Sequence, residues 1–325
     1  MDSVYTLIAK TLAPFFYPWM SNQRIFWLYL LTSLLIAAAA FYVARRNGYI
    51  GASSGLLKYL FPREVLGHRS ARVDYRFFVV NTIGLAFFIS PILLGTKPVM
   101  EATVAALRPF VGFDGIGVVP GPVDHLIYTA AIIIALDGGV FLAHYLQHKV
   151  PVLWEFHKVH HSAEVLTPIT VYRMHPVDDI LTGTLSSVTI GVVAGVFHSI
   201  YTVTPTAILV FNLNLFIFIF YFFGYNLRHS HVWLAYPTGL SHILISPAQH
   251  QIHHSSAPQH FDRNFGFIFA FWDWMAGSLY VPKKREELNF GLDADEHLAF
   301  DSVWQLYARP FRRVMERYRP RRSEP

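Results

Sequence analysis

Histidines are concentrated in three short segments of this chain, at spacings that suit metal binding. The three segments have the patterns HxxxH, HxxHH and HxxHH, and their members are His144 and His148; His157, His160 and His161; and His250, His253 and His254. Side chains three or four residues apart lie on one face of a helix, so each segment directs several imidazoles to one place. Neutral imidazole is a common ligand of zinc, iron and copper. Eight ligands exceed the ordinary coordination number of one ion, so the pattern predicts two metal ions.

Long apolar runs surround these histidines. The chain has 325 residues, of which 53% are hydrophobic and only 14% charged, which is too apolar for an ordinary soluble domain. About 20 apolar residues cross a bilayer as a helix. We expect five spans, at residues 25–44, 77–96, 126–147, 180–200 and 205–226. The last two lie in a run without charged residues and would form a helical hairpin, with Pro205 in its turn.

The basic residues predict how these spans are oriented, because cytoplasmic loops carry an excess of Lys and Arg. The loop between the first two spans is rich in them, whereas the next loop has only Lys97 and Arg108. The tail is also basic, at Arg309, Arg312, Arg313, Arg317, Arg319, Arg321 and Arg322. The first loop and the tail would therefore face the cytoplasm and the N-terminus the outside. This arrangement, typical of a bacterial inner membrane protein or an equivalent, places every histidine cluster on the cytoplasmic side.

One carboxylate lies within an expected span. Asp137 precedes His144 by seven residues and His148 by eleven, so the three side chains share one helical face. A carboxylate inside a membrane is costly and usually functional. Metal-bound imidazole usually donates its other N–H to a carboxylate, carbonyl or water. Asp137 is therefore a candidate catalytic-site residue, as partner of an imidazole or as a direct ligand; the alternative is polar packing within the bundle.

Several function classes are excluded by composition. The chain has no cysteine, which excludes thiolate metal sites, iron–sulfur clusters and a cysteine nucleophile. It has no glycine-rich phosphate loop and no nucleic-acid-binding module, and the basic loops account for its net charge of +5. We therefore expect no nucleic acid partner.

The segments around the histidines resemble the fatty acid hydroxylase/sterol desaturase superfamily of membrane enzymes. The resemblance covers roughly residues 125 to 285. Its motifs are Asp137 with His144 and His148, Trp154-Glu-Phe-His-Lys-Val-His-His-Ser162, Ser246-Pro-Ala-Gln-His-Gln-Ile-His-His-Ser255 and Asp262-Arg-Asn-Phe-Gly266. It implies an integral-membrane di-iron oxygenase, which uses O2 and two electrons to hydroxylate or desaturate an unactivated C–H bond of a lipid.

The resemblance also implies further site residues. It calls for a ninth ligand between the second and third clusters, for which His229 fits better than His231, two residues further on. His175, followed by Pro176 and the acid Asp178, matches a recurrent family feature. We assign His175 to the catalytic site, and we expect His175 and Asp178 to be supporting or structural groups and not ligands. The nine expected metal ligands are His144, His148, His157, His160, His161, His229, His250, His253 and His254. Asp262 and Asn264 are expected to cap and hold the third cluster.

The expected fold is an all-α integral membrane bundle of about five spans with a cytoplasmic, histidine-rich di-metal cap. Three regions follow: an N-terminal membrane region at 1–124, a catalytic domain at 125–285 and a basic cytoplasmic tail at 286–325. The expected cofactor is a pair of iron ions, which zinc can replace during purification, because zinc binds imidazole sites more tightly than ferrous iron.

Two other classes of function remain open at this stage. A membrane zinc hydrolase would need three protein ligands and an open position, and the chain has no HExxH motif. A metal transporter or store would need polar residues through the membrane, where only Asp137 is found. For the oxygenase, the expected partners are a lipid from the bilayer, O2 and a separate electron donor, because the chain has no recognisable flavin or cytochrome domain.

Overall fold

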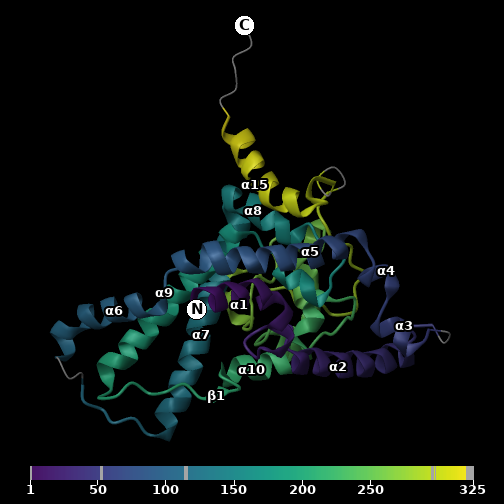
Figure 1. The fold of residues 1–325 in the computed structure, drawn as a ribbon. Coiled ribbons are helices and arrows are strands. Elements are labelled where there is room, and N and C mark those ends of the chain that lie inside the picture. The colour runs from purple at the N-terminus through teal and green to yellow at the C-terminus, as the bar shows by residue number, and fades with distance from the viewer. Residues whose placement is uncertain (1, 52–53, 113–115, 294–295, 297, 320–325) are drawn as a thin grey trace.

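A computed structural model gives a mostly helical protein, with the helices gathered around the histidine segments (Figure 1). It describes residues 2–51, 54–112, 116–293, 296 and 298–319. The longer helices are α1 (Asp2–Phe16), α2 (Trp27–Arg46), α5 (Arg69–Gly84), α6 (Thr96–Val111), α7 (Pro122–Lys149), α8 (Pro151–His161), α9 (Pro176–Ile200) and α15 (Val303–Tyr318). Shorter elements are α3 (Leu56–Leu60), α4 (Arg63–Leu66), α10 (Leu215–Phe222), α11 (Thr238–Ser241), α12 (Pro247–His253), α13 (Phe271–Ala276) and the strands β1 (Leu209–Val210) and β2 (Leu213–Asn214).

Four stretches of the described residues are long and apolar enough to cross a membrane, and they support an integral membrane protein. They are α2, the stretch Arg69–Val111, α7 and α9. Within Arg69–Val111, α5 continues through a π-helical segment (Leu85–Ile89) and a 3₁₀ turn (Ser90–Ile92) before α6 begins. The second expected span, 77–96, therefore covers only the centre of a longer helical stretch.

The expected fifth span at 205–226 is wrong as a continuous helix. Residues 209–214 form the antiparallel hairpin of β1 and β2, and the helix that follows, α10, has only 8 residues. Such a helix is about 12 Å long, whereas the hydrocarbon core of a bilayer is about 30 Å thick. The cause is local: Phe211 and Asn212 both have positive φ, as a tight hairpin turn requires, and Asn214 caps α10 by accepting a hydrogen bond from the Phe216 N–H. Pro205 thus lies in a loop and not in a helical hairpin.

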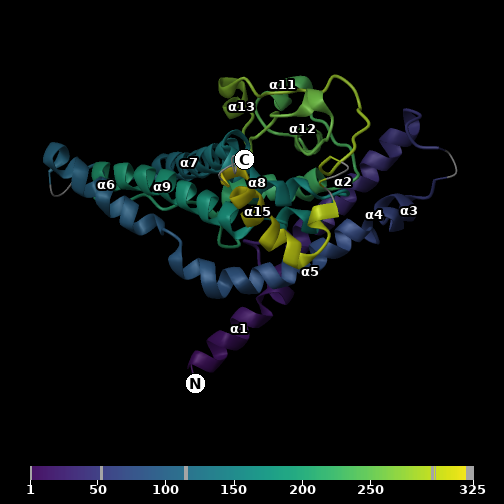
Figure 2. The same ribbon diagram turned by 90° about the horizontal axis from the view of Figure 1, so that it is seen from above.

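Helix α9 packs against both α6 and α7, and the three helices lie at the same end of the molecule in Figure 2. A Cβ atom added at Gly139 of α7 would lie 2.6 Å from the Cα of Ser186 in α9, so only glycine permits this approach. On α9, Gly191 has the same role toward Val99 of α6, also at 2.6 Å. The close contact fixes the start of α9 beside the end of α7, where the first histidine cluster lies.

Arg173 ties the three expected regions of the chain together. Its guanidinium is fully buried and donates hydrogen bonds to the Asp74 carboxylate in α5 at 2.6 Å and to the Val159 carbonyl in α8 at 2.8 Å. It also donates to the hydroxyl of Ser162 at 2.7 Å and to the carbonyl of Phe300 near the C-terminus at 3.1 Å. The N-terminal, central and C-terminal regions therefore converge on one buried cation.

We predict that Arg173→Met lowers the free energy of unfolding by about 3–5 kcal/mol, because it leaves the Asp74 carboxylate buried without its partner. Thermal and denaturant unfolding of the detergent-solubilised protein measures this change. The matched control is Arg69→Met, which breaks the exposed ion pair with Asp301 and should change stability by at most about 1 kcal/mol. Equal effects of the two substitutions would contradict the conclusion that the buried ion pair of Arg173 with Asp74 stabilises the fold.

Candidate metal centre

Local sequence signals start and stop the short helices that carry the histidines. Pro151 occupies the first turn of α8, where its missing N–H costs nothing, and this places the second cluster directly after the first. Ser246 caps α12 in a capping box with Gln249, so the third cluster lies on a short, well-defined helix. The 3₁₀ turn Tyr225–His229 ends at the ninth expected histidine.

The structure gathers the nine expected histidines into two adjacent groups. In each group, one ring nitrogen per residue lies within 4.8 Å of the corresponding nitrogens of the others. Site 1 contains His144, His148, His157, His161 and His253, and site 2 contains His160, His229, His250 and His254. The rings of His161 and His254 stack at 4.7 Å, so the two sites adjoin. The geometry fits two metal ions; that these side chains bind metal stays a prediction.

In site 1, two imidazoles are oriented by backbone carbonyls, and the Nε2 atoms of all five are buried and free of protein partners among the described residues. The Nδ1–H of His144 donates to the Phe265 carbonyl at 2.7 Å, and that of His253 donates to the Arg263 carbonyl at 2.8 Å. A ring that donates through Nδ1 carries a lone pair on Nε2, which is the form that a metal ligand requires.

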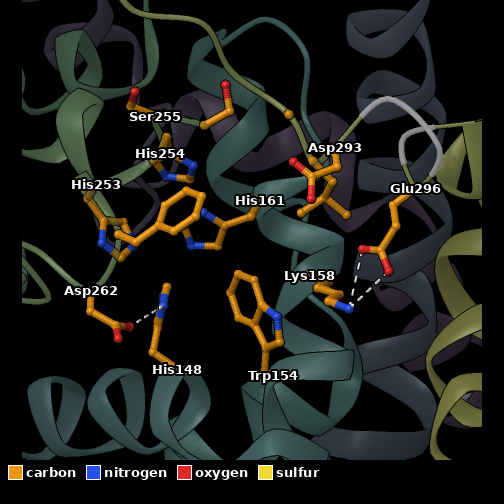
Figure 3. Close-up of a pocket in the computed structure, with 14 residues that line it drawn as sticks. His148, Trp154, Lys158, His161, His253, His254, Ser255, Asp262, Asp293 and Glu296 are labelled. Carbon is orange, nitrogen blue, oxygen red and sulfur yellow. Dashed lines mark hydrogen bonds and ion pairs between the residues drawn. The ribbon is translucent and has the colours of Figure 1, made fainter. Parts of the chain in front are cut away.

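Two carboxylates also support site 1. An oxygen of the buried Asp178 lies 3.5 Å from Nδ1 of His157, and an oxygen of Asp262 lies 3.8 Å from Nδ1 of His148 (Figure 3). Asp262 is held in turn by Lys149 at 2.7 Å. Asp262 therefore supports the first cluster, whereas we expected it to hold the third. The third cluster is held by Asn264, whose side-chain amide donates to the Gln249 carbonyl of α12 at 3.0 Å.

Site 2 has three Nε2 atoms in a triangle. The Nε2 atoms of His229, His250 and His254 are separated by 3.1–3.2 Å. This is close to the spacing of nitrogens that surround one ion at about 2.0–2.1 Å in a tetrahedral arrangement. His160, the fourth member, donates from Nδ1 to the Arg173 carbonyl at 3.3 Å, so the backbone of Arg173 also orients this imidazole.

Burial keeps these imidazoles neutral. It lowers the pKa of His157, His161 and His253 well below the usual range, because the imidazolium would lose its hydration and face neighbouring imidazoles. The pKa values of the site 2 histidines are lowered for the same reason, that of His160 to about 3. Neutral, preoriented imidazoles with free lone pairs fit a transition-metal ion such as iron or zinc.

The two candidates for the ninth ligand lie in different places. His229 belongs to site 2, whereas Nε2 of His231 donates to the Tyr59 carbonyl at 2.6 Å, away from both sites. The turn ends at His229, and the chain becomes extended at Ser230. The change of backbone direction separates two residues that the sequence alone could not distinguish by spacing.

Asp137 does not contact a histidine, so the expected partnership with an imidazole is wrong. Its two carboxylate oxygens accept hydrogen bonds from the backbone N–H groups of Ile268 and Phe269 and from the indole of Trp272, at 2.7–3.0 Å. Seven residues of helix raise His144 about 10 Å above Asp137, too far for a hydrogen bond although both share one face. The carboxylate instead anchors the segment that carries the Phe265 carbonyl.

His175 also lies outside both sites, so its assignment to the catalytic machinery is corrected. Its Nδ1 accepts a hydrogen bond from the Val177 N–H and caps α9, and its Nε2 donates to the Tyr307 carbonyl. Asp178, one turn further along, is the member of this motif that lies beside a histidine.

The sequence did not predict the roles of Arg173 and of the carbonyl acceptors. Backbone carbonyls leave no signal in residue types, and Arg173 is marked only by its place two residues before His175.

Two cavities adjoin the histidines. The first, of about 420 Å³, is lined by His148, His161, His253 and His254, and Trp154 packs against His148 and His161 (Figure 3). The second, of about 80 Å³, is named the inner cavity and is lined by His144 and His157 of site 1 and by His160, His229 and His250 of site 2. Each cavity therefore reaches histidines of both sites.

The site and the apolar helices define a histidine-rich integral membrane protein. Residues 129–278 match the model of the fatty acid hydroxylase family, and these residues include all nine histidines. The match confirms the resemblance of this region to the fatty acid hydroxylase/sterol desaturase superfamily.

Curated relatives share the same part of the chain. An alkylglycerol monooxygenase from Danio rerio is 27% identical over 54% of this chain and 37% of its own length. The ornithine lipid hydroxylase OlsE from Rhizobium tropici is 27% identical over 56% of this chain and 49% of its own length. This chain thus spans about half or less of the curated relatives it matches. No solved structure matches the chain significantly.

We predict that protein reconstituted anaerobically with ferrous iron holds close to two ions per chain, and that His229→Ala reduces this to close to one, because site 2 loses one corner of its triangle. Elemental analysis by mass spectrometry measures the content. His231→Ala is the matched control, since this neighbouring imidazole binds a carbonyl outside the sites, and it should retain the wild-type content. One ion per chain in the wild type would contradict the two-site arrangement.

Proposed function

We propose that the protein is a membrane di-iron oxygenase that hydroxylates an unactivated C–H bond of a lipid. The observation that carries the proposal is the pair of buried sites made of nine neutral imidazoles at the ends of apolar helices. The family match and the relatives support it, because they include a monooxygenase that is named for alkylglycerol and a hydroxylase that is named for ornithine lipid. These names favour hydroxylation over desaturation.

The reaction needs chemistry that side chains lack. In the proposed overall reaction, R–H, O2, two electrons and two protons give R–OH and water. Two bound iron ions would supply the redox chemistry for activating O2. In our proposal, site 1 and site 2 each hold one of them, and a separate electron donor supplies the electrons. Zinc found in a purified sample would reflect its higher affinity for imidazole.

The residues of the chain hold and shield this centre. The carbonyls of Phe265, Arg263 and Arg173 accept the Nδ1 protons and so fix the ring orientation that a ligand needs. Asp137 acts as a positioning residue, because it anchors the segment that carries Phe265. Apolar side chains of Val140, Val171 and Phe267 line the inner cavity beside the histidines, so they reduce the contact of water with the centre on that side.

The alternatives fit these sites less well. A zinc hydrolase needs three ligands and one open position, whereas site 1 alone brings five imidazoles together. A transporter would carry its metal ligands along a path through the membrane, whereas all nine histidines lie in two adjoining groups. We further propose the division at 1–124, 125–285 and 286–325, with the middle region as the catalytic part.

We predict that cells expressing the protein accumulate a lipid that gains one oxygen atom, and that purified protein consumes O2 when given this lipid and an electron donor. Comparative lipid mass spectrometry identifies the product. His253→Ala should abolish the product because site 1 loses a ligand, and His231→Ala should leave it unchanged. A product that has lost two hydrogens would assign the protein to desaturation, and unchanged turnover of His253→Ala would refute the proposed site.

We also propose that the metal centre faces the cytoplasm of a bacterial inner membrane or an equivalent membrane. The absence of cysteine allows a direct test with single cysteines at exposed positions. Asn47→Cys lies after α2 in the basic first loop, and Val119→Cys lies in the loop before α7. An impermeant maleimide added to intact spheroplasts should label Val119→Cys only, and Asn47→Cys only after permeabilisation. The opposite pattern would reverse the orientation.

A further inference from the structure

A polar cavity adjoins the inner cavity. Its volume is about 290 Å³, and Arg24, Val171 and Met174 line both this polar cavity and the inner cavity. A molecule in the polar cavity is therefore separated from the histidines of both sites only by the inner cavity.

The polar cavity is lined by two opposite charges that form no close ion pair. Arg24 and Asp179 are partly buried, and neither takes part in an ion pair among the described residues. They attract each other across the cavity without direct contact. One oxygen of the Asp179 carboxylate, Oδ2, is buried and has no hydrogen-bond partner among these residues. Charges held apart in this way are only partly compensated, so a ligand that carries both complementary charges would stabilise the arrangement.

The remaining lining also suits a polar ligand. It includes the hydroxyl or amide groups of Tyr17, Tyr172, Tyr221, Asn22, Asn81 and Thr82. A hydrocarbon chain in this place would cover Arg24 and Asp179 without offering them a hydrogen bond. A headgroup, in contrast, can offer an oxyanion to the planar guanidinium and an ammonium group to the carboxylate.

The inner cavity connects the polar cavity with the metal centre. It is lined by Arg24, Val171 and Met174, which also line the polar cavity, and by histidines of both sites. When a headgroup occupies the polar cavity, the atoms next to it are therefore the part of the lipid nearest the histidines.

We propose that the polar cavity binds the zwitterionic headgroup of the lipid substrate, with Arg24 holding its oxyanion and Asp179 its ammonium group, and that the oxidised C–H lies within a few bonds of this headgroup. The inference rests on the proposed lipid hydroxylation and specifies its substrate class and position of attack. It assigns Arg24 and Asp179 as substrate-binding residues; neither belongs to the histidine pattern, and Arg24 also lies outside the residues of the family match.

The first test measures binding without turnover. Metal-free, full-length protein in detergent is titrated with a short-chain N-acyl amino-acid lipid bearing a free amine, with phosphatidylethanolamine and with neutral diacylglycerol, and the shift in unfolding temperature gives the affinity. Arg24→Gln and Asp179→Asn should each weaken binding of the zwitterionic lipids about tenfold or more, because each removes a charge-assisted hydrogen bond, and should leave diacylglycerol unaffected. The two zwitterionic lipids distinguish a carboxylate from a phosphate as the oxyanion.

Arg63→Gln is the matched control, since it removes an exposed arginine of α4 and should change no affinity. Arg24→Lys keeps the charge without the planar fork and should give an intermediate loss, so that the test stands even if Arg24→Gln folds poorly. Wild-type affinities of Arg24→Lys and Asp179→Asn for the zwitterionic lipids would overturn the inference.

The second test locates the oxygen in the product by tandem mass spectrometry. We expect it in the headgroup or on the carbons next to it, and an oxygen near the terminal methyl group would overturn the proposed position. The two proposals fail separately. Charge-dependent binding without any turnover of iron-loaded protein would refute the proposed oxygenase activity and retain the headgroup site. Turnover that does not depend on Arg24 or Asp179 would refute the headgroup site and retain the oxygenase activity.

Discussion

The structure depends on keeping many imidazoles buried, neutral and aimed at common points. Burial removes the hydration that would stabilise the charged form of each ring, and the mutual proximity of the rings would add repulsion between charged imidazoles. The chain meets this constraint by giving the back of several rings a fixed acceptor, the carbonyls of Phe265, Arg263 and Arg173. The Nε2 atom of each of these rings then remains available to bind a ligand.

Much of the rest of the fold serves these acceptors. Asp137 anchors the segment behind His144, Asn264 fixes α12, and Arg173 connects the second cluster with α5 and the C-terminal region. The close contact at Gly139 brings Asp178 of α9 beside His157 of α8. Buried polar groups of this kind are costly unless satisfied, and Asp137, Asn264 and Arg173 are satisfied by segments that carry or orient a histidine.

The sequence predicts the histidines of the site better than the groups that orient them. Histidine spacing is a property of residue types on helices, so the nine histidines that gather are the nine expected from the sequence. Asp137 shows the limit, because periodicity reports which face a residue occupies and not its height along the helix axis. The span at 205–226 shows another, because hydropathy averages over a window and overlooks the turn at Phe211 and Asn212. Arg228, buried against Phe220 and Tyr225, was also not foreseen, since an arginine in an apolar segment gives no sign of its partners.

The backbone carbonyls that orient His144, His253 and His160 affect how far the sequence around such a site can change without loss of the site. A main-chain oxygen is present whatever side chain its residue carries, so substitution at Phe265, Arg263 or Arg173 leaves the acceptor in place as long as the path of the chain is kept. The orientation of the rings is thus encoded in loop shape more than in residue identity. Homologous chains can drift far apart in sequence around such a centre and still present the same array of nitrogen lone pairs.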